Sequence, residues 1–375
     1  MKNYYRICAE INLDNIYHNI CEIKKKVGDG VRIMPVIKAD GYGHGAVSVA
    51  KKIMSLADMF AVAVIEEAIE LRAAHITKPI MILGTLPYAR YEEAVKYDVT
   101  VPVYTEAMAL HLSDMAKKLG KVAKTHLAVD TGMRRIGMSC DEEGIKLVKK
   151  IWEIDNLEVD GIFTHFATAD MSDKSFAFLQ KERFESFCND LESEGISIKC
   201  RHICNSAAIT DMPDTYLNMV RPGIITYGLY PSDDIDKTAI NLKPAMEIKS
   251  IVSYVKNVNR GEGISYGLTH VLETDRKIAT IPVGYADGYP RLLSDKGRVI
   301  IHGQYAPIVG RICMDQFMVD VTHIDNVEPE DSVTLMGRDG ECFIGADEIA
   351  SIAQTISYEI ICGIGKRVPR IYHEE

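Results

Sequence analysis

A single lysine follows an apolar run near the start of the chain, in the sequence Val36-Ile37-Lys38-Ala39-Asp40-Gly41-Tyr42-Gly43-His44-Gly45. Burial at the end of a strand disfavours the charged ammonium, so Lys38 is expected in the neutral form that attacks a carbonyl carbon and holds it as a Schiff base. The glycines after it predict a sharp turn that passes close to a ligand. The same pattern also fits a strand that ends in a surface lysine and a turn, so other residues must decide.

Further polar and small residues follow later apolar runs in the same way. They are Asp130 and Arg135, then His165, then Asn205 and Ser206, and finally Arg221 with Gly223 and Ile224. The Ser206 hydroxyl and the backbone amides around Gly223 and Ile224 could point at phosphate oxygens, as the amides of helix N-termini do. Ser206 also fits the N-cap of a helix. These residues can act together only if the fold brings the ends of the runs to one rim.

Eight short apolar runs alternate with amphipathic segments over the first two thirds of the chain. The runs are residues 33–38, 60–65, 80–84, 99–104, 125–130, 159–164, 199–204 and 218–226. Apolar residues at helical spacing mark segments such as 65–72 and 175–194 between them. Eight such units predict an α/β fold, a (β/α)8 TIM-like barrel whose functional residues lie at the carboxyl ends of the strands. A doubly wound open sheet is the alternative, but no Gly-rich nucleotide turn follows the first run.

The pattern changes in the last third of the chain, where short β-branched runs are broken by glycine and turn residues. The runs are residues 248–258, 277–283, 298–302, 306–312, 317–321 and 332–336, with one short helix expected over 346–354. This pattern predicts a mainly-β domain. The sequence therefore divides into residues 1–235, the barrel that carries Lys38, and residues 236–375, the C-terminal domain.

Composition narrows the class of protein. A length of 375 residues with 47% hydrophobic and 26% charged residues is typical of a globular protein with two domains. The net charge of −10 disfavours nucleic acid or an anionic membrane as partner. Nine cysteines without CxxC pairs or zinc-type spacing predict reduced thiols, a cytoplasmic location and no bound metal. Residues 1–6 lack the apolar core of a signal peptide, and no apolar stretch is long enough to span a membrane.

The lysine motif resembles the cofactor-lysine signature of the alanine racemases, enzymes of fold type III that use pyridoxal 5'-phosphate. The likeness continues in the family's order through motifs that cover nearly the whole chain. They are Asp130-Thr131-Gly132-Met133-Arg134-Arg135, Thr164-His165-Phe166-Ala167, Asn205-Ser206-Ala207-Ala208, Val220-Arg221-Pro222-Gly223-Ile224, Gly263-Ile264-Ser265-Tyr266-Gly267, Gly284-Tyr285-Ala286-Asp287-Gly288 and Val309-Gly310-Arg311-Ile312-Cys313-Met314-Asp315-Gln316.

The resemblance implies racemisation by two bases, one on each face of the substrate α-carbon. Lys38 would form the internal aldimine with the cofactor and serve one face. Tyr266, from the C-terminal domain of the partner subunit in a homodimer, would serve the other. Its phenol has an ordinary pKa near ~10 and needs help to ionise, and His165 is implied as its hydrogen-bonding neighbour.

Arg221 is implied to meet the pyridine nitrogen, where many other pyridoxal enzymes have a carboxylate. An arginine does not usefully give up a proton, so the carbanion would be less delocalised and would be reprotonated at the same carbon. The other cofactor contacts that the resemblance implies are Tyr42, His165, Asn205, Ser206, Gly223, Ile224 and Tyr358. On the substrate side it implies Arg135, together with Met314, Asp315 and Tyr285 from the partner subunit.

One position departs from the family's pattern. Many relatives carry a lysine two residues before the aspartate of Asp130-Thr131-Gly132-Met133, modified to a carbamate that holds a neighbouring arginine. This chain has Ala128 there. Another group must therefore orient Arg135, and activity is expected not to depend on added bicarbonate.

The predicted function is the interconversion of L-alanine and D-alanine, which supplies D-alanine for peptidoglycan. A serine racemase of the same fold stays open, because one extra hydroxyl changes binding little unless the pocket has a partner for it. A non-catalytic carrier of pyridoxal phosphate is a second alternative, although a carrier needs no second base such as Tyr266. A metal-dependent hydrolase lacks support, since no His-x-His or HExxH pair occurs and Asp315 and Asp320 fit strand faces.

Overall fold

The computed structural model describes residues 6–374, and residues 1–5, which hold most of the N-terminal segment examined for a signal peptide, lie outside it. The described chain divides into two compact units. The barrel unit contains Asn15–Gly41 and Ala46–Lys243. The strand-rich unit contains the described residues up to Asp14, the short segment Tyr42–Gly45 and the chain from Pro244 onward. The barrel unit ends at Lys243, eight residues beyond the boundary expected from the sequence.

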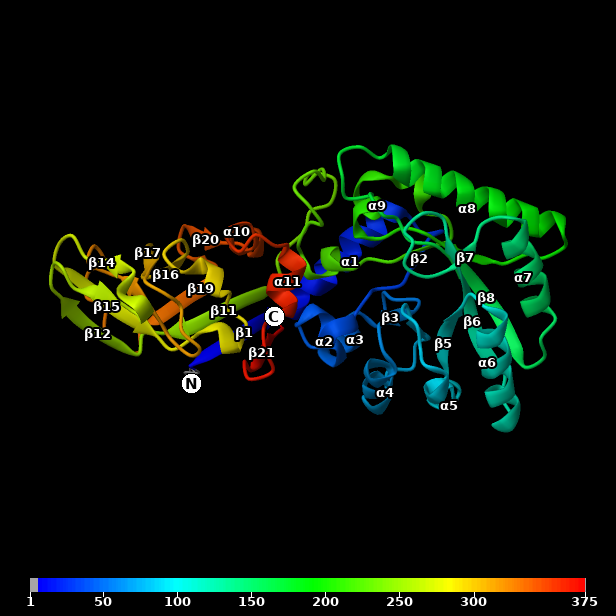
Figure 1. Ribbon diagram of the computed structural model, residues 1–375, viewed down its shortest axis with the longest axis horizontal. Helices are drawn as coiled ribbons and strands as arrows, with labels where there is room; N and C mark the ends of the chain where they lie inside the picture. Colours follow the sequence, from blue (N-terminus) through cyan, green and yellow to red (C-terminus); the bar gives the residue numbers. More distant parts are fainter. Residues whose placement is uncertain (1–5, 375) are drawn as a thin grey trace. The chain divides into compact units, whose positions relative to one another are not determined.

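Parallel strands form the interior of the barrel unit (Figure 1). They are β2 (Arg32–Ile33), β3 (Phe60–Val62), β4 (Ile80–Ile82), β5 (Val99–Val103), β6 (Ala123–Asp130), β8 (Leu157–Phe163), β9 (Cys200–His202) and β10 (Met219–Val220), with the short β7 (Met138–Ser139) beside β6. The order β3-β4-β5-β6-β8-β9 is continuous, and β10 pairs with β2. Just beyond β2, Val36 forms a bridge to Ala61 of β3. Just beyond β10, the Arg221 amide donates to the Cys204 carbonyl that follows β9, so the sheet closes. The predicted barrel is confirmed, and each of the eight apolar runs contributes a strand.

Helices follow the strands and cover their outer side (Figure 1). They are α1 (Leu13–Val27), α2 (Lys38–Tyr42), α3 (Ala46–Ile53), α4 (Ile65–Ala73), α5 (Tyr91–Lys96), α6 (Glu106–Lys118), α7 (Glu142–Trp152), α8 (Ser175–Ser193) and α9 (Ser206–Asp211), with 3-10 turns η1 (Tyr88–Arg90), η2 (Pro213–Thr215) and η3 (Ile224–Tyr227). Ile65, Ala68 and Leu71 show why α4 is a helix, because this spacing turns one apolar stripe toward the sheet, where all three are buried.

Antiparallel strands dominate the strand-rich unit. They are β1 (Ile7–Asn12), β11 (Met246–Ile251), β12 (Tyr254–Val258), β13 (Gly263–Ile264), β14 (His270–Val271), β15 (Arg276–Ile281), β16 (Arg298–Ile301), β17 (Gln304–Val309), β18 (Phe317–Asp320), β19 (Ser332–Asp339), β20 (Cys342–Ile344) and β21 (Arg370–His373). The main sheet has the order β12-β15-β18-β17-β16-β19-β11-β1-β21, with β20 on β19. Two helices, α10 (Ala346–Ile352) and α11 (Ser357–Cys362), and the turns η4 (Tyr266–Leu268), η5 (Tyr285–Asp287) and η6 (Arg291–Leu293) complete the unit.

The strand-rich unit differs from the sequence prediction in several places, which include the short strands β13, β14, β20 and β21 that no predicted run covers. Strand β1, from the N-terminal end of the chain, lies in its main sheet between β11 and β21. The run 248–258 forms two strands, β11 paired with β19 and β12 paired with β15. Between them, the Val252 amide donates to the Asp331 carbonyl and the Ser253 amide donates to the Thr280 carbonyl, so the chain changes its pairing partner there. Helix α11 was not predicted. Pairing partners far along the chain decide the placement of β1 and the division of the run 248–258.

Two findings bear on the expectations from composition. None of the helices within residues 6–374 is long and apolar enough to cross a bilayer. All nine cysteines lie in the described part of the chain and are free thiols. Burial raises the pKa of several of them, to about 12 for Cys188 and Cys204, so these buried thiols stay protonated.

Candidate active site

Lys38 lies at the carboxyl end of the first barrel strand, as the sequence predicts. The Ile37 amide donates to the Ala61 carbonyl at 2.8 Å, which continues the pairing with β3 beyond β2 itself. The hydroxyl of Tyr227 donates to the Val36 carbonyl at 3.0 Å. These bonds hold the strand up to the residue before Lys38, whose own side chain is half-buried.

The backbone after Lys38 forms a left-handed turn. Ala39 and Asp40 both have φ 52° and ψ 50°, Gly41 has φ 61° and ψ 44°, and Tyr42 has φ 52°. A non-glycine residue in this region costs roughly 1–2 kcal/mol because Cβ approaches the carbonyl oxygen. Three such residues in one turn therefore need compensating bonds, and they are found. The Gly41 amide donates to the Ile37 carbonyl, and the Asp40 carboxylate accepts from the amide of Ala46.

The glycines at positions 43 and 45 are needed for close packing within the strand-rich unit. A Cβ on Gly43 would lie 2.4 Å from the Ile361 carbonyl oxygen, and one on Gly45 would lie 1.9 Å from the Tyr372 hydroxyl. Both also have positive φ, at 81° and 91°. The sequence predicted a close approach to a ligand, whereas the atoms that require glycine here belong to the chain itself.

Arg221, at the end of β10, is buried and donates to five acceptors. One terminal nitrogen donates to Nδ1 and to the carbonyl of His202, both at 2.8 Å. The other donates to the carbonyls of Thr164 and Ile203, at 2.8 and 3.0 Å, and to Nδ1 of His165 at 3.2 Å. Burial lowers the pKa of Arg221 to about 10, so the guanidinium keeps its charge at neutral pH. The predicted contact between Arg221 and His165 is present.

These contacts select one tautomer for each histidine. A guanidinium can only donate, so Nδ1 of His165 and Nδ1 of His202 are acceptors, and their protons lie on Nε2. Burial lowers the pKa of His165 to about 3, helped by the charges of Arg221, Arg135 and Lys38. His165 is therefore a neutral ring that offers an Nε2–H donor.

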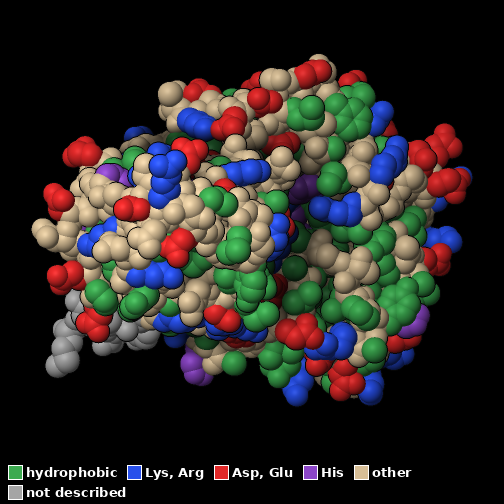
Figure 2. All heavy atoms as spheres, turned by 60° about the vertical axis from the view of Figure 1, so that its left-hand side comes forward, with side chains coloured by type: hydrophobic (Ala, Val, Ile, Leu, Met, Phe, Trp, Pro, Cys, Tyr) green, Lys and Arg blue, Asp and Glu red, His purple; other side chains and the backbone are tan. Residues whose placement is uncertain are grey.

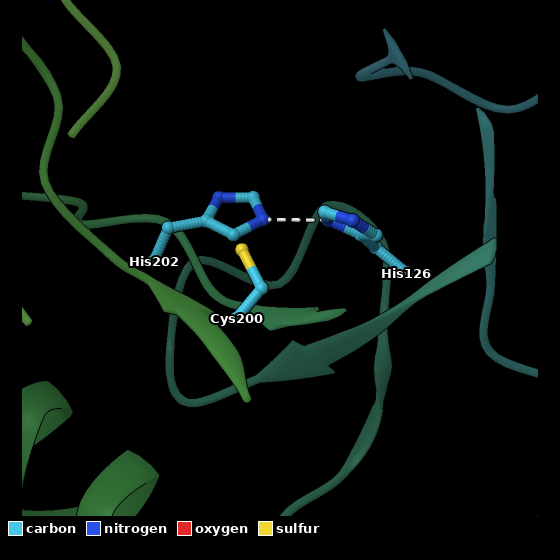
Figure 3. Close-up of side chains that lie close together, drawn as sticks. All are labelled: His126, Cys200 and His202. Atoms are coloured by element: carbon cyan, nitrogen blue, oxygen red, sulfur yellow. Dashed lines mark hydrogen bonds between the residues drawn. The ribbon is translucent and has the colours of Figure 1, made fainter. Parts of the chain in front are cut away.

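A second histidine extends the chain of bonds into the barrel (Figure 3). Nε2 of His202 donates to Nδ1 of His126 at 2.9 Å, with Cys200 beside both rings. The pairing of β6 with β8 has an irregularity at His126, and a Cβ on its partner Gly161 would lie 2.6 Å from the His126 ring. The Phe163 ring stacks on His202 at 5.1 Å between centroids. Glycine and the irregular register thus make room for a polar pair inside an apolar barrel.

The three side chains in Figure 3 are of the types that bind zinc, and their potential ligand atoms lie within 4.8 Å of one another. Their contacts point to a different role. The facing nitrogens of His126 and His202 already share a hydrogen bond, and the other nitrogen of His202 accepts from Arg221. Burial also raises the pKa of the Cys200 thiol to about 11, away from the thiolate that a metal requires. A dication would face the fixed charge of Arg221, so this cluster serves as the continuation of the arginine's hydrogen bonds.

The two loops after β9 and β10 are joined by a direct bond. The Gly223 amide donates to the Ser206 hydroxyl oxygen at 2.8 Å. Asn205 is the N-cap of α9, since its side chain accepts from the Ala208 amide, so the alternative of Ser206 as the cap is wrong. The Ser206 hydroxyl keeps its own proton for another acceptor. Ile224 begins η3, and the first amides of a helix have no acceptor within it.

Gln180 on α8 was missed in the sequence although it shapes the rim. Its side chain is fully buried, donates to the His165 carbonyl at 3.0 Å and to the Thr131 hydroxyl at 3.2 Å, and accepts from the Ala167 amide at 2.8 Å. It therefore joins the loops after β6 and β8. The available signal was a polar residue on the apolar stripe of a long helix. Arg135, in the first of these loops, has an exposed side chain.

Tyr266 extends from a strained loop of the strand-rich unit. Its side chain is 69% exposed. The preceding residue, Ser265, has φ 65°, and its hydroxyl donates to the Arg311 carbonyl at 2.6 Å. Gly267 follows with φ 78°. This backbone turns the phenol outward rather than into the core of its own unit.

The residues predicted for the substrate entrance lie together in the strand-rich unit. The amides of Tyr285 and Ala286 donate to the carbonyls of Cys313 and Met314, at 3.2 and 3.0 Å. Asp315 follows and forms an ion pair of 2.7 Å with Arg367. The side chains of Tyr285, Met314 and Asp315 are all exposed.

The two tyrosines that the resemblance implies as cofactor contacts are neighbours in the strand-rich unit. The ring centroids of Tyr42 and Tyr358 are 6.1 Å apart, with the planes tilted by 47°. Burial raises the pKa of Tyr42, so its hydroxyl remains a donor.

Comparison with known proteins places the chain in a family. The sequence profile of the alanine racemase N-terminal domain matches residues 11–231, and that of the alanine racemase C-terminal domain matches residues 245–372. The chain belongs to the alanine racemase family. It is therefore an enzyme, and the resemblance of its motifs to those of alanine racemases is confirmed.

Relatives and solved structures match the chain over its full length. The alanine racemase of Desulforamulus reducens is 48% identical over 367 residues, which is 98% of this chain and 98% of that one. The structure of the alanine racemase of Clostridium difficile 630 has a TM-score of 0.95 and 42% identity, covering 99% of this chain and 97% of that one. The alanine racemase from Bacillus anthracis with bound L-Ala-P has a TM-score of 0.92 and 36% identity, covering 100% and 96%.

Proposed function

We propose that this alanine racemase family member interconverts L-alanine and D-alanine with pyridoxal 5'-phosphate held on Lys38, and that its active form is a homodimer with shared sites. The observation that carries the proposal is the group around His165. The buried Arg221 donates to Nδ1 of His165 at 3.2 Å, and Lys38 stands at the end of the first barrel strand. A lysine, a buried arginine and a neutral histidine at one rim form the donor set that this chemistry needs.

The residues of the barrel unit fit pyridoxal phosphate by their chemistry. The phosphate requires donors, which Ser206 and the first amides of η3 offer. Bound pyridoxal phosphate would supply a carbonyl carbon for an amine and a ring that withdraws electrons from the substrate α-carbon. Lys38 offers the amine.

Arg221 would hold the ring nitrogen without protonating it. Its pKa of about 10 stays well above neutral pH, so it donates a hydrogen bond and retains its proton. By leaving the ring nitrogen without a proton, Arg221 would favour return of a proton to the α-carbon over transamination. The bonds of Arg221 to three backbone carbonyls leave the guanidinium little freedom to move.

Two bases would act on opposite faces of the substrate. Lys38 would take or return a proton at Nζ on one face, and the Tyr266 phenol oxygen of a second copy would do so on the other. The Nε2–H of His165 would donate to that oxygen and favour its ionised form, because the ring is neutral and its tautomer is set by Arg221.

The surface around Tyr266 supports a second copy as the partner. Leu268 is 62% exposed, Val271 56% and Met314 53%, and all three belong to the same unit as Tyr266. On the face shown in Figure 2, Lys and Arg side chains are interspersed with Asp and Glu, and hydrophobic side chains are exposed between them. Apolar residues around a strained, outward-pointing tyrosine fit an interface better than a surface in water.

Alanine is the substrate that the relatives favour. The B. anthracis enzyme, similar over the whole chain, holds L-Ala-P in its structure. D-Alanine made in the cytoplasm would supply peptidoglycan, and the nine free thiols are in keeping with that reducing compartment.

One experiment tests the whole proposal. The purified protein is mixed with pyridoxal phosphate, reduced with borohydride and digested, and the labelled peptide is identified by mass, with Lys38→Ala as the control. Turnover is then measured on L-alanine and L-serine. A label on Lys38 with faster turnover of alanine is expected. A label on another lysine, or none, would overturn the cofactor assignment, and faster turnover of serine would overturn the substrate.

A further inference from the structure

Glu67 on α4 makes a contact that its place in the helix does not require. Its Oε2 accepts from the amides of Ala63 and Val64, at 2.7 and 3.3 Å. This is one half of a capping box, because Glu67 is the third residue of α4 and accepts from the amide of the N-cap Val64, whose apolar side chain has no acceptor for a return bond. Its Oε1 instead accepts from the amide of Ala39, 2.6 Å away and 28 residues earlier in the chain.

The Ala39 amide is the first one after Lys38. The left-handed turn starts there, and its far end is secured by the Gly41 amide on Ile37 and by the Asp40 carboxylate on Ala46. At the start of the turn, the bond to Glu67 fixes the peptide group between Lys38 and Ala39. The Glu67 carboxylate thus links the turn after Lys38 to the segment between β3 and α4, because amides of both segments donate to it.

We propose that Glu67 is a positioning residue for Lys38. By holding the Ala39 amide, it keeps the strained turn formed and sets the direction in which the lysine side chain leaves the barrel rim. A lysine has four rotatable side-chain bonds, so a fixed backbone is what limits the positions of its amine to those from which it meets a carbonyl carbon. This inference rests on the proposed function, in which Lys38 carries the cofactor.

The variants Glu67→Ala and Glu67→Gln test the inference, with Glu70→Ala and Glu70→Gln as matched controls at an exposed position of the same helix. Alanine removes both acceptors. Glutamine keeps one acceptor oxygen and can hold only one of the two loops. Removing a hydrogen bond to a charged group should shift the equilibrium between the closed and the open turn by roughly tenfold or more.

The first measurement is hydrogen–deuterium exchange of residues 38–43 in the cofactor-free protein. In Glu67→Ala, the Ala39 amide should exchange at least about tenfold faster than in the wild type, with Glu67→Gln between them and the Glu70 variants unchanged. Exchange of Ala39 that is equal in the wild type and Glu67→Ala would overturn the inference.

The second measurement is the rate at which pyridoxal phosphate becomes attached to Lys38, followed by borohydride quenching and the mass of the Lys38 peptide. The urea midpoint of each variant is measured first, and the assay is run well below it so that the protein stays folded. A slower rate then reports lost positioning of Lys38 and not unfolding caused by loss of the helix cap. Glu67→Ala should be slower by about tenfold or more, and a folded Glu67→Ala that matches Glu70→Ala would overturn the role. If Glu67→Ala does not fold, Glu67→Gln decides by the same two measurements. A wild type unlabelled at Lys38 would overturn the proposed function, and the exchange of Ala39 would still decide whether Glu67 holds the turn.

Discussion

The bond chain from His126 through His202 and Arg221 to His165 differs from the Tyr266 loop in how the side chains are held. In the bond chain, Arg221, His202 and His126 are buried, and one hydrogen bond links each member to the next. In the loop, Tyr266 is mostly exposed, and only the backbone around Ser265 directs it. Hydrogen bonds between buried side chains thus fix the first region within the barrel unit, whereas in the second region the backbone sets the direction of an exposed phenol.

The comparison teaches that stability and activity are coupled in the first region and separable in the second. A change within the bond chain leaves buried polar atoms without partners, so it should unfold the barrel as well as inactivate it. A change at the tip of the Tyr266 loop removes no buried contact of its own unit. Four changes test this difference, beginning with the largest expected effect.

Arg221→Leu should be the most damaging change. It leaves the carbonyls of Thr164, His202 and Ile203 and two imidazole nitrogens without their donor. We expect the free energy of unfolding to fall by about 3 kcal/mol or more, because each buried acceptor left without its donor costs about 1–3 kcal/mol, with loss of racemisation. Urea unfolding followed by circular dichroism measures the first effect. A midpoint within error of the wild type would contradict the buried network.

Tyr266→Phe should inactivate without unfolding. The exposed phenol makes no buried contact in its unit, so the unfolding free energy should change by less than ~0.5 kcal/mol. Loss of one base should lower kcat by roughly 10²- to 10⁴-fold. Labelling of Lys38 by pyridoxal phosphate and borohydride should be unaffected. Racemisation that is unchanged in both directions would refute the two-base account.

Acid should weaken the buried region. Burial lowers the pKa of His126 to about 4, while an unfolded histidine titrates near ~6.5. Between these values the unfolded state binds more protons, so stability falls as pH falls through this window, by up to about 1.4 kcal/mol per pH unit for each such histidine.

His126→Gln should therefore flatten the dependence of unfolding free energy on pH between pH 6.5 and 4, measured by urea titrations at several pH values. His165 and His202, whose pKa values are also lowered by burial, keep the rest of the slope. Tyr266→Phe is the matched control and should leave the slope as it is. An equal slope in wild type and His126→Gln would show that this ring is not held neutral.

The smallest effect is expected for Asp315→Asn. Its ion pair with Arg367 joins two side chains that are each about half exposed, and such pairs contribute about 0–1 kcal/mol. Arg367 also keeps its second partner, the buried Asp287. We expect an unfolding free energy within ~1 kcal/mol of the wild type, with a difference that shrinks as salt is added. A larger, salt-independent loss would mean that Asp315 is buried by another contact.

Much of the barrel rim could be predicted, because its polar residues stand where the apolar runs end. Lys38, His165, Ser206 and Arg221 each follow an apolar run, and eight runs with helical segments between them indicate a barrel. Gln180 and Glu67 escaped notice, since each reads as one polar residue on a helix. The pairing of His126 with His202 could not be found from spacing, because 76 residues separate them.

The order of elements, the residue types at the strand ends and membership of the alanine racemase family were determined by the sequence itself, because apolar periodicity and motif order are local properties of the chain. Only the tertiary structure decided that β1 joins the strand-rich unit, that Arg221 sets the tautomers of two histidines, and that Glu67 binds the turn after Lys38. These features depend on burial and on hydrogen bonds between residues far apart in sequence. Their energies come from removing charges and polar groups from water, which no local pattern records.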